Sequence, residues 1–244
     1  MKNNKAAARS RPRRRLAAAA GIALLVVLGL FAASLLGDPL SRAYSVHHAV
    51  DYANETWPGQ DFQVTEVSFS PGWSYQVTVR SSTSQDTRFS LRVELGVVRS
   101  TDDASQVETL NNTRSRIDAA LTADVRAAME AAGFAPFGAT DFAIGYGGEG
   151  QEGATLEEQG FALNMPYDKA NLPVEVSLEI FGFDNQPGQE LGQQILHDAK
   201  AAMEAAGIRI DRYSVDIYDA HAPYEESSTD NTWSSGQVPA DQIP

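Results

Sequence analysis

The sequence contains no cysteine among its 244 residues. This absence excludes disulfide bonds, catalysis by a thiol, zinc sites with cysteine ligands and attachment of a lipid through a cysteine. Small exported domains usually need disulfides to supplement a limited core, but a folded region of about 180 residues can bury a sufficient core without them. The chain therefore depends on its hydrophobic core for stability.

Acidic residues are missing from the first 37 positions. All 32 of them lie at or after Asp38, together with only 12 of the 19 basic residues, so the region from Asp38 onward has a net charge of −20. Such a charge repels nucleic acid, anionic lipid and anionic wall polymers. It keeps an exported domain soluble or attracts a basic partner, and the composition leaves both interpretations open.

Motifs of enzyme active sites are also missing. No Gly-x-Ser-x-Gly motif and no phosphate-binding loop occur, and the glycine-rich run Gly145–Gly150 indicates a flexible turn. The histidines do not form a motif, although His47 and Asp51 are four residues apart, which is typical of a solvated helix pair and could also serve a shared metal ion or proton. The sequence therefore predicts no catalytic, cofactor-binding or metal site. The four histidines are His47, His48, His197 and His221.

Two groups of carboxylates leave alternatives open. The first group is Glu149, Glu152, Glu157 and Glu158. Carboxylate oxygens suit calcium, but this group lacks the alternating ligand spacing of a calcium loop, so a solvated loop is favoured. The second group, Asp102 and Asp103, could serve a glycosidase-type reaction only with another carboxylate across a cleft. Its position at a predicted helix start already explains it.

The N-terminal region combines a basic segment with a long uncharged run. Residues 1–15 contain seven basic side chains and no acid, and no charge occurs from Leu16 to Gly37. The apolar residues 16–36 span about 30 Å as a helix, roughly the hydrocarbon core of a bilayer and longer than a cleavable h-region. We predict a cytoplasmic basic segment (1–15), a transmembrane signal anchor (16–36) and an extracellular C-terminal domain. Cleavage near Ala32-Ala33-Ser34, giving a secreted product, is the alternative.

Hydrophobic periodicity predicts a first module over residues 43–99. Gly37-Asp38-Pro39 breaks the helical run, and a helical stripe then begins at Val46 and ends at Trp57. Three segments with period-two alternation follow, and their polar positions give each strand one solvated face. The apolar positions run from Phe62 to Phe69, from Trp73 to Val79 and from Phe89 to Leu95, and the polar partners include Gln76, Thr78, Arg80, Arg88, Ser90 and Arg92.

A second α+β region is predicted over residues 103–220. Asp103 and Gln106 have the spacing of a capping box at the start of a helix that Gly133 ends. Alternating segments at 142–146, 161–165 and 174–180 predict strands, and a helix (191–206) and a strand (208–217) follow. Residues 221–244 have the composition of a disordered tail. The fold class is therefore α+β: a transmembrane helix, two helix-plus-antiparallel-meander units and a final helix-strand.

One heptapeptide occurs twice. Ala127–Gly133 recurs letter for letter as Ala201–Gly207, at an offset of 74 residues. Coincidence in two alanine-rich helices is one explanation, because alanine is the strongest helix former. An internal duplication is the favoured explanation, because the same offset also superposes the apolar stripes of the two helices. This offset carries Ile117 onto Leu191, Leu121 onto Ile195 and Val125 onto Ala199.

Several short motifs follow one another over residues 37–98. They are Gly37-Asp38-Pro39-Leu40-Ser41, Trp57-Pro58-Gly59-Gln60-Asp61-Phe62, Tyr75-Gln76-Val77 and Ser84-Gln85-Asp86-Thr87-Arg88-Phe89. Their order resembles the N-terminal region of YfjL-like proteins of Gram-positive bacteria, which implies a membrane-anchored protein of a functionally uncharacterised family. Residues 43–99 are also similar to the PepSY pattern, a helix ending in an aromatic-Pro-Gly and strands with Tyr-x-Val-x-Val. That similarity implies a binding or inhibitory domain without an active site.

The sequence favours a membrane-anchored extracytoplasmic protein that acts as a non-enzymatic binding or interaction module. Its expected partners are the membrane, through Leu16–Leu36, and a basic protein or peptide outside the cell, with no nucleic acid and no cofactor. The alternative is an extracytoplasmic carboxylate-dependent hydrolase that uses Asp102, Asp103 or the acidic loop. A third interpretation is a subunit whose membrane helix assembles with others. The small residues that permit such assembly are Gly21, Gly29, Ala32 and Ala33.

Overall fold

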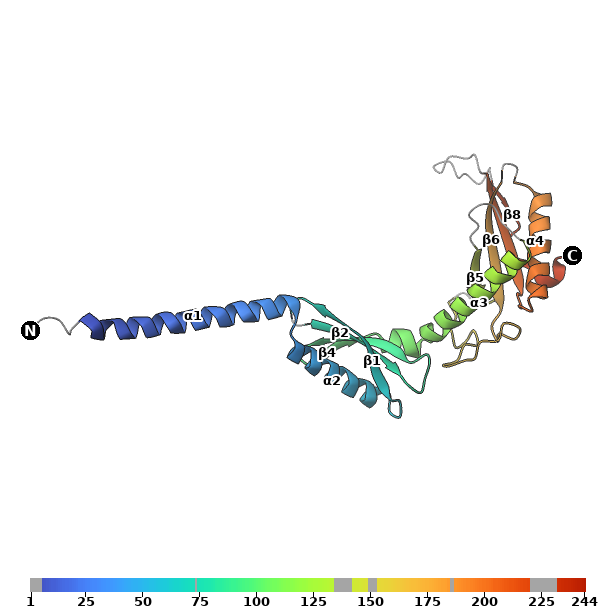
Figure 1. Cartoon of the computed structure of the whole chain (residues 1–244). Helices are drawn as coiled ribbons and strands as arrows, with labels where there is room; N and C mark the ends of the chain where they lie inside the picture. The colour runs from blue at the N-terminus through green and yellow to red at the C-terminus, as the bar shows by residue number, and fades with distance from the viewer. Residues whose placement is uncertain (1–5, 73, 134–141, 149–152, 185–186, 220–231) are drawn as a thin grey trace, which may run out of the picture. The chain divides into compact units, whose positions relative to one another are not determined.

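The computed structural model describes residues 6–72, 74–133, 142–148, 153–184, 187–219 and 232–244 (Figure 1). The chain divides into two compact units, Met1–Ala104 and Ser105–Pro244. Each unit combines helices with a β-sheet of mainly antiparallel strand pairs, so the α+β class is confirmed.

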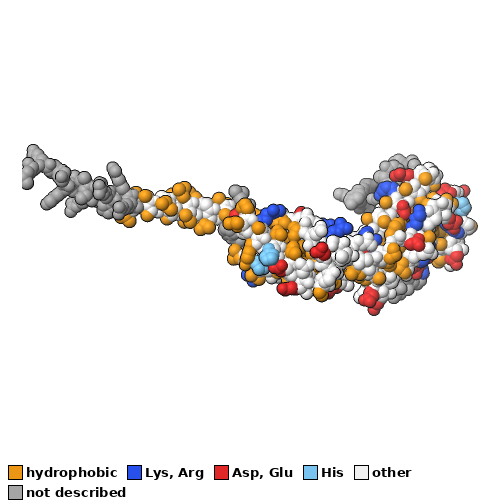
Figure 2. Space-filling view, turned by 60° about the horizontal axis from the view of Figure 1, so that its bottom comes forward, with side chains coloured by type: hydrophobic (Ala, Val, Ile, Leu, Met, Phe, Trp, Pro, Cys, Tyr) orange, Lys and Arg blue, Asp and Glu red, His pale blue; other side chains and the backbone are white. Residues whose placement is uncertain are grey.

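The first unit starts with α1 (Ala6–Leu36), one continuous helix. Its stretch Leu16–Ala33 is long and apolar enough to cross a membrane, and the side chains there are exposed. Figure 2 shows hydrophobic side chains along the helix. Gly37 follows with a φ of 75°, which glycine adopts without steric cost, and the helix ends there. The structure thus confirms one N-terminal apolar helix of membrane-spanning length.

Helix α2 runs from Pro39 to Thr56. It therefore begins earlier in the chain than its hydrophobic stripe, whose first residue is Val46. Asp38 caps it, because one carboxylate oxygen accepts hydrogen bonds from the backbone N–H groups of Leu40 (3.0 Å) and Ser41 (2.9 Å). The Ser41 hydroxyl also donates to this carboxylate. The hydroxyl and the two N–H groups lower the pKa of Asp38. Pro39 suits the first helical position, because an N–H group there would have no acceptor within the helix.

One antiparallel sheet completes the first unit, in the order β1-β2-β3-β4. Its strands are β1 (Phe62–Ser70), β2 (Ser74–Ser81), β3 (Arg88–Glu94) and β4 (Val97–Thr101). The first three were expected from their alternation. Strand β4 is additional, and its exposed and half-buried side chains carry no apolar period that could reveal it.

Helix α2 covers one face of this sheet (Figure 1). It presents three small buried side chains, Ser45, Ala49 and Ala53, so its backbone can approach the strands closely. The strands contribute alternate residues to the core, as the period of two predicts. These core side chains include Tyr75, Val77, Val79, Phe89, Leu91 and Val93.

In the second unit, α3 (Asn111–Ala131) begins well after Asp103, so the predicted capping box is wrong. The chain first forms a short π-helical segment, Ala104–Glu108, and Leu110 then takes a left-handed conformation with a φ of 62°, which interrupts the helical path. Asp103 accepts a hydrogen bond from the adjacent N–H of Ala104 at 2.9 Å instead. Gly133, with a φ of 69°, follows the end of α3 as predicted.

The second sheet has the order β5-β6-β7-β8, and the short strand β9 pairs with β7. The strands are β5 (Phe142–Tyr146), β6 (Val176–Asp184), β7 (Arg212–Asp219), β8 (Thr232–Ser234) and β9 (Val238–Pro239). Strand β5 is antiparallel to β6. The final helix-strand, α4 (Gln189–Ala205) and β7, adds a strand parallel to β6, because the helix carries the chain back to the same end of the sheet.

Residues 161–165 do not form the strand that their alternation predicts. They lie in a turn, in which the N–H of Met165 bonds to the carbonyl of Ala162 at 3.0 Å. Phe161 and Met165 are nevertheless buried in the core. The alternation is real, but it comes from a loop that directs apolar side chains inward.

The disordered tail predicted for residues 221–244 is wrong for residues 232–244, while 221–231 lie outside the described residues. Strands β8 and β9 pair with β7, and Ile243 is only 4% exposed within the core. The ammonium group of Lys200 on α4 donates a hydrogen bond to the carbonyl of Ile243 at 2.6 Å. Widely spaced apolar residues in a polar segment are therefore enough to anchor the chain end.

The stripes that share the 74-residue offset are buried in both α3 and α4, apart from the half-buried Leu191, and the two helices contact each other and the same core. Each helix is followed by a left-handed glycine, Gly133 or Gly207. Near the start of α4, a Cβ atom added to Gly192 would lie 1.8 Å from the ring of Trp233. Glycine at this position lets the last strands pack against the helix.

Candidate functional site

Among the described residues of the first unit, no element covers the face of the first sheet opposite α2. Alternation places polar side chains on this face of all four strands. One row across the sheet is Ser68, Gln76, Arg92 and Ser100, and the next contains Glu66, Thr78 and Ser90. We call this surface the open face. In these two rows every side chain is polar, in contrast to the face under α2.

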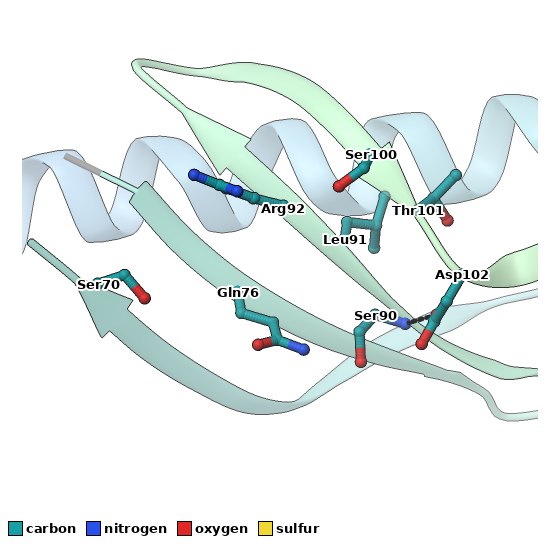
Figure 3. Close-up of a pocket in the computed structure, with 8 residues that line it drawn as sticks. All are labelled: Ser70, Gln76, Ser90, Leu91, Arg92, Ser100, Thr101 and Asp102. Carbon is teal, nitrogen blue, oxygen red and sulfur yellow. Dashed lines mark hydrogen bonds between the residues drawn. The ribbon is translucent and has the colours of Figure 1, made fainter. Parts of the chain in front are cut away.

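A hollow of about 400 Å³ lies on the open face (Figure 3). All four strands contribute to it, together with Asp102 directly after β4. Figure 3 shows hydroxyl, amide, guanidinium and carboxylate groups spread along its length. The lining residues are Ser70, Gln76, Ser90, Leu91, Arg92, Ser100, Thr101 and Asp102.

Hydrogen bonds and an ion pair fix the charged groups of the hollow. The Arg92 guanidinium donates to the hydroxyl of Ser74 at 3.1 Å and pairs with Glu94 at 2.7 Å. The Asp102 carboxylate accepts a hydrogen bond from the backbone N–H of Ser90. The charge of Arg92 is therefore paired within the protein, and the carboxylate of Asp102 is tied to the backbone of β3. The hollow presents hydroxyl and amide groups that can donate to and accept from a polar ligand.

The carboxylates proposed for hydrolysis have different surroundings. Asp102 lines the hollow, whereas Asp103 is buried. Asp103 accepts hydrogen bonds from the Thr101 hydroxyl at 3.1 Å and from the Trp57 indole N–H at 3.4 Å. Trp57, which ends the hydrophobic stripe of α2, is half-buried and is tied to Asp103 by its indole N–H.

The acidic loop lies in the second unit, and Glu149 and Glu152 fall outside the described residues. Glu157 is exposed. Glu158 accepts hydrogen bonds from the N–H and the hydroxyl of Thr155, which lower the pKa of its carboxyl. Within the described part of the chain, no group of three or more His, Asp or Glu side chains could hold a metal ion.

His47 and His48 are neighbours on α2, with ring centroids 5.8 Å apart, whereas His197 lies on α4 in the second unit. His47 approaches Asp51 at 3.3 Å, and both side chains are largely exposed, as expected for a solvated helix pair. His48 packs its ring on Tyr44. His197 lies beside Asp198 on α4, and His221 is outside the described residues.

The sequence identified part of this site. Alternation in β2 and β3 predicted their solvated face, including Gln76, Ser90 and Arg92. It did not reveal that Ser100 and Asp102 border the same hollow, because β4 has no apolar period. Gly96 is a sequence signal for the turn between Glu94 and Val97, and its φ of 78° is one that glycine adopts readily.

Comparison with known protein families gives a match in the first unit. The family model described as YfjL-like, N-terminal domain matches residues 13–101. The chain contains a YfjL-like N-terminal domain. The match ends at Thr101, the last residue of β4, so α2 and the whole first sheet lie inside the YfjL-like domain. No curated protein and no solved structure matches the chain.

Proposed function

We propose that this protein is a membrane-anchored extracytoplasmic binding module that recognises a polar partner at the open face of its YfjL-like domain. The observation that carries the proposal is the hollow of about 400 Å³ on that face. The four-stranded sheet packs one face on α2, which makes it a rigid scaffold. Its other face is polar and presents groups that can bind a ligand.

The anchor is α1, with its basic end in the cytoplasm. The seven basic residues before Leu16 and the absence of acids there support this orientation, because positive charge is retained on the cytoplasmic side. The YfjL-like domain and the second unit then face the outside. Retention is supported by the exposed apolar length of Leu16–Ala33.

Binding is favoured over hydrolysis by the surroundings of the two candidate acids. Glycosidase-type hydrolysis needs two carboxylates that face the substrate, and among the described residues that line the hollow Asp102 is the single carboxylate. Asp103 is buried and already hydrogen-bonded, and Asp102 holds the backbone of β3. Their arrangement supports a structural role at the end of β4.

A basic protein or peptide is the proposed partner. The second unit contains 23 acidic and seven basic residues, whereas the part of the first unit from Asp38 onward contains nine acidic and five basic residues. The negative field therefore comes mainly from the second unit and accelerates the encounter with cations. The hydroxyl and amide groups of the open face are suited to bond the backbone of a peptide.

The binding proposal predicts a salt-dependent interaction with an oligolysine peptide. With the full chain in phosphatidylcholine nanodiscs, the dissociation constant measured by fluorescence anisotropy is expected to rise several-fold from low salt to physiological salt. The reason is that exposed charges farther apart than about 8 Å are screened at physiological ionic strength. An oligoglutamate peptide of equal length should not bind.

A matched pair of variants tests the open face itself. Ser100→Leu fills part of the hollow and should weaken oligolysine binding, whereas Ser82→Leu, on an exposed loop away from the hollow, should not. Equal binding by both variants would contradict the open face as the site. Binding that is unchanged by salt would contradict the role of charge, and hydrolysis of a peptide or glycan by the chain would overturn the binding function.

A further inference from the structure

Outside α1, the exposed large hydrophobic side chains of the described residues are all in the first unit. They are Leu40 (83% exposed), Tyr44 (54%), Leu95 (72%) and Val97 (50%). Single exposed apolar side chains need no explanation, but a group confined to one place on an otherwise polar protein marks an interaction surface. The second unit has none among its described residues.

These side chains come from two segments that touch. Leu40 and Tyr44 lie on the first turns of α2, and Leu95 and Val97 flank Gly96 at the turn between β3 and β4. A Cβ atom added to Gly96 would lie 2.0 Å from the Tyr44 ring, so the turn packs directly on the helix. We call this group of four residues the apolar end.

The apolar end adjoins the end of α1. Leu36 is the last residue of α1, and Leu40 is the second residue of α2, so only Gly37, Asp38 and Pro39 separate them in the chain. A Cβ atom on Gly37 would lie 3.1 Å from the ring of Phe69 on β1 and 3.0 Å from the hydroxyl oxygen of Tyr75 on β2. The Tyr75 hydroxyl also lies 2.8 Å from the hydroxyl of Ser41. These contacts hold the sheet against the point where α1 ends.

The backbone at Leu95 supports a role for its side chain. Its φ is 48°, a left-handed conformation that costs free energy for leucine and that glycine or asparagine adopts more readily. The side chain gains no burial in return, because it is 72% exposed. The two-residue turn between Glu94 and Val97 requires a positive φ at both Leu95 and Gly96, and asparagine or glycine would meet this requirement without exposing an apolar side chain.

We propose that the apolar end inserts into the headgroup region of the bilayer in which α1 is anchored, and this inference rests on the anchoring proposed above. Apolar side chains bury their surface there, and the ring of Tyr44 suits the boundary between hydrocarbon and water. Arg42 on α2 can pair with lipid phosphate beside the apolar end, whereas Arg99 on β4 pairs with Glu94 at 3.4 Å within the protein. The YfjL-like domain then rests on the membrane surface and is not suspended freely from α1.

The absence of cysteine makes the test direct. Single cysteines replace Leu95, Leu40, Ser82 or Leu28 in the full chain, and each variant carries an environment-sensitive fluorophore in phosphatidylcholine vesicles. Lipids spin-labelled near the headgroup or deep in the acyl chain act as quenchers. The emission of the labels at Leu95→Cys and Leu40→Cys should shift to shorter wavelength in the vesicles. Their fluorescence should be quenched by the lipid that is spin-labelled near the headgroup. The label at Ser82→Cys, on the exposed β2–β3 loop, should do neither.

The label at Leu28→Cys separates the two proposals. Quenching at Leu28 by the deep quencher, without quenching at Leu95 or Leu40, would overturn the insertion of the apolar end and leave the anchor intact. No quenching at Leu28 would overturn the anchor itself. A blue shift at Leu95 that persists in detergent and does not respond to lipid quenchers would assign the apolar end to a protein contact and contradict the proposal.

Discussion

Replacing Leu121 by Asp is expected to lower the free energy of unfolding by about 4 kcal/mol or more. Leu121 is fully buried on α3, in the same cluster as Ile195 and Ala199 of α4. The substitution removes apolar contacts and places a carboxyl group without partners in the core. Urea unfolding of the full chain in detergent, followed by circular dichroism, measures the effect.

Ala119→Asp is the matched control for this prediction. It places the same charge on α3, but at an exposed position. Its expected effect is within about 0.5 kcal/mol of the wild type, as for most surface changes. If Leu121→Asp and Ala119→Asp unfolded at the same urea concentration, the stripe repeated at the 74-residue offset would not be the core of the second unit.

Deleting residues 232–244 is expected to destabilise the second unit by about 4 kcal/mol. The deletion removes β8 and β9, so the backbone of β7 loses its pairing partners on that side. It also exposes apolar surface now covered by Trp233, Val238 and Ile243. A disordered tail, as its composition indicates, could be removed without any effect. Hydrogen exchange of the β7 amide groups measures the difference.

Two point variants separate loss of packing from loss of chain length. Ile243→Asp buries a charge, whereas Gln242→Asp adds one at an exposed neighbour. Faster exchange at β7 is expected for the first variant and not for the second. Protection at β7 that survives both the deletion and Ile243→Asp would show that the chain end is not part of the core.

Much of the fold follows from periodicity alone. The uncharged run from Leu16 predicts α1, and the alternation in β1, β2 and β3 predicts both the buried and the polar face of the first sheet. The left-handed glycines Gly133 and Gly207 mark the ends of α3 and α4. In each case one strong local signal agrees with the element that the structure shows.

The remaining errors come from places where burial does not follow a local period. Strand β4 pairs with β3 through its backbone while its side chains stay near the surface, so composition does not reveal it. Phe161 and Met165 alternate like a strand but reach the core from a turn. Ile243 joins the core from a polar segment, because tertiary contacts with α4 and β7 outweigh the local composition.

The candidate site shows the same limit. The polar residues of β2 and β3 are evident from alternation, but a hollow depends on which strands lie side by side and on how the sheet curves. The carboxylates Asp102 and Asp103 are adjacent in sequence, yet one lines the hollow and the other is buried against Trp57. Their different roles depend on contacts with distant residues that no local pattern contains.

The central claim is that α1 holds the chain in a membrane with both units outside, and cysteine labelling in intact cells tests it directly. Because the native chain has no cysteine, Ser10→Cys and Ser82→Cys each provide one reactive thiol. A membrane-impermeant maleimide should label Ser82→Cys in intact cells and should label Ser10→Cys only after lysis. Labelling of Ser10→Cys but not Ser82→Cys in intact cells, or recovery of the Ser82→Cys chain in the medium without residues 1–15, would contradict the account.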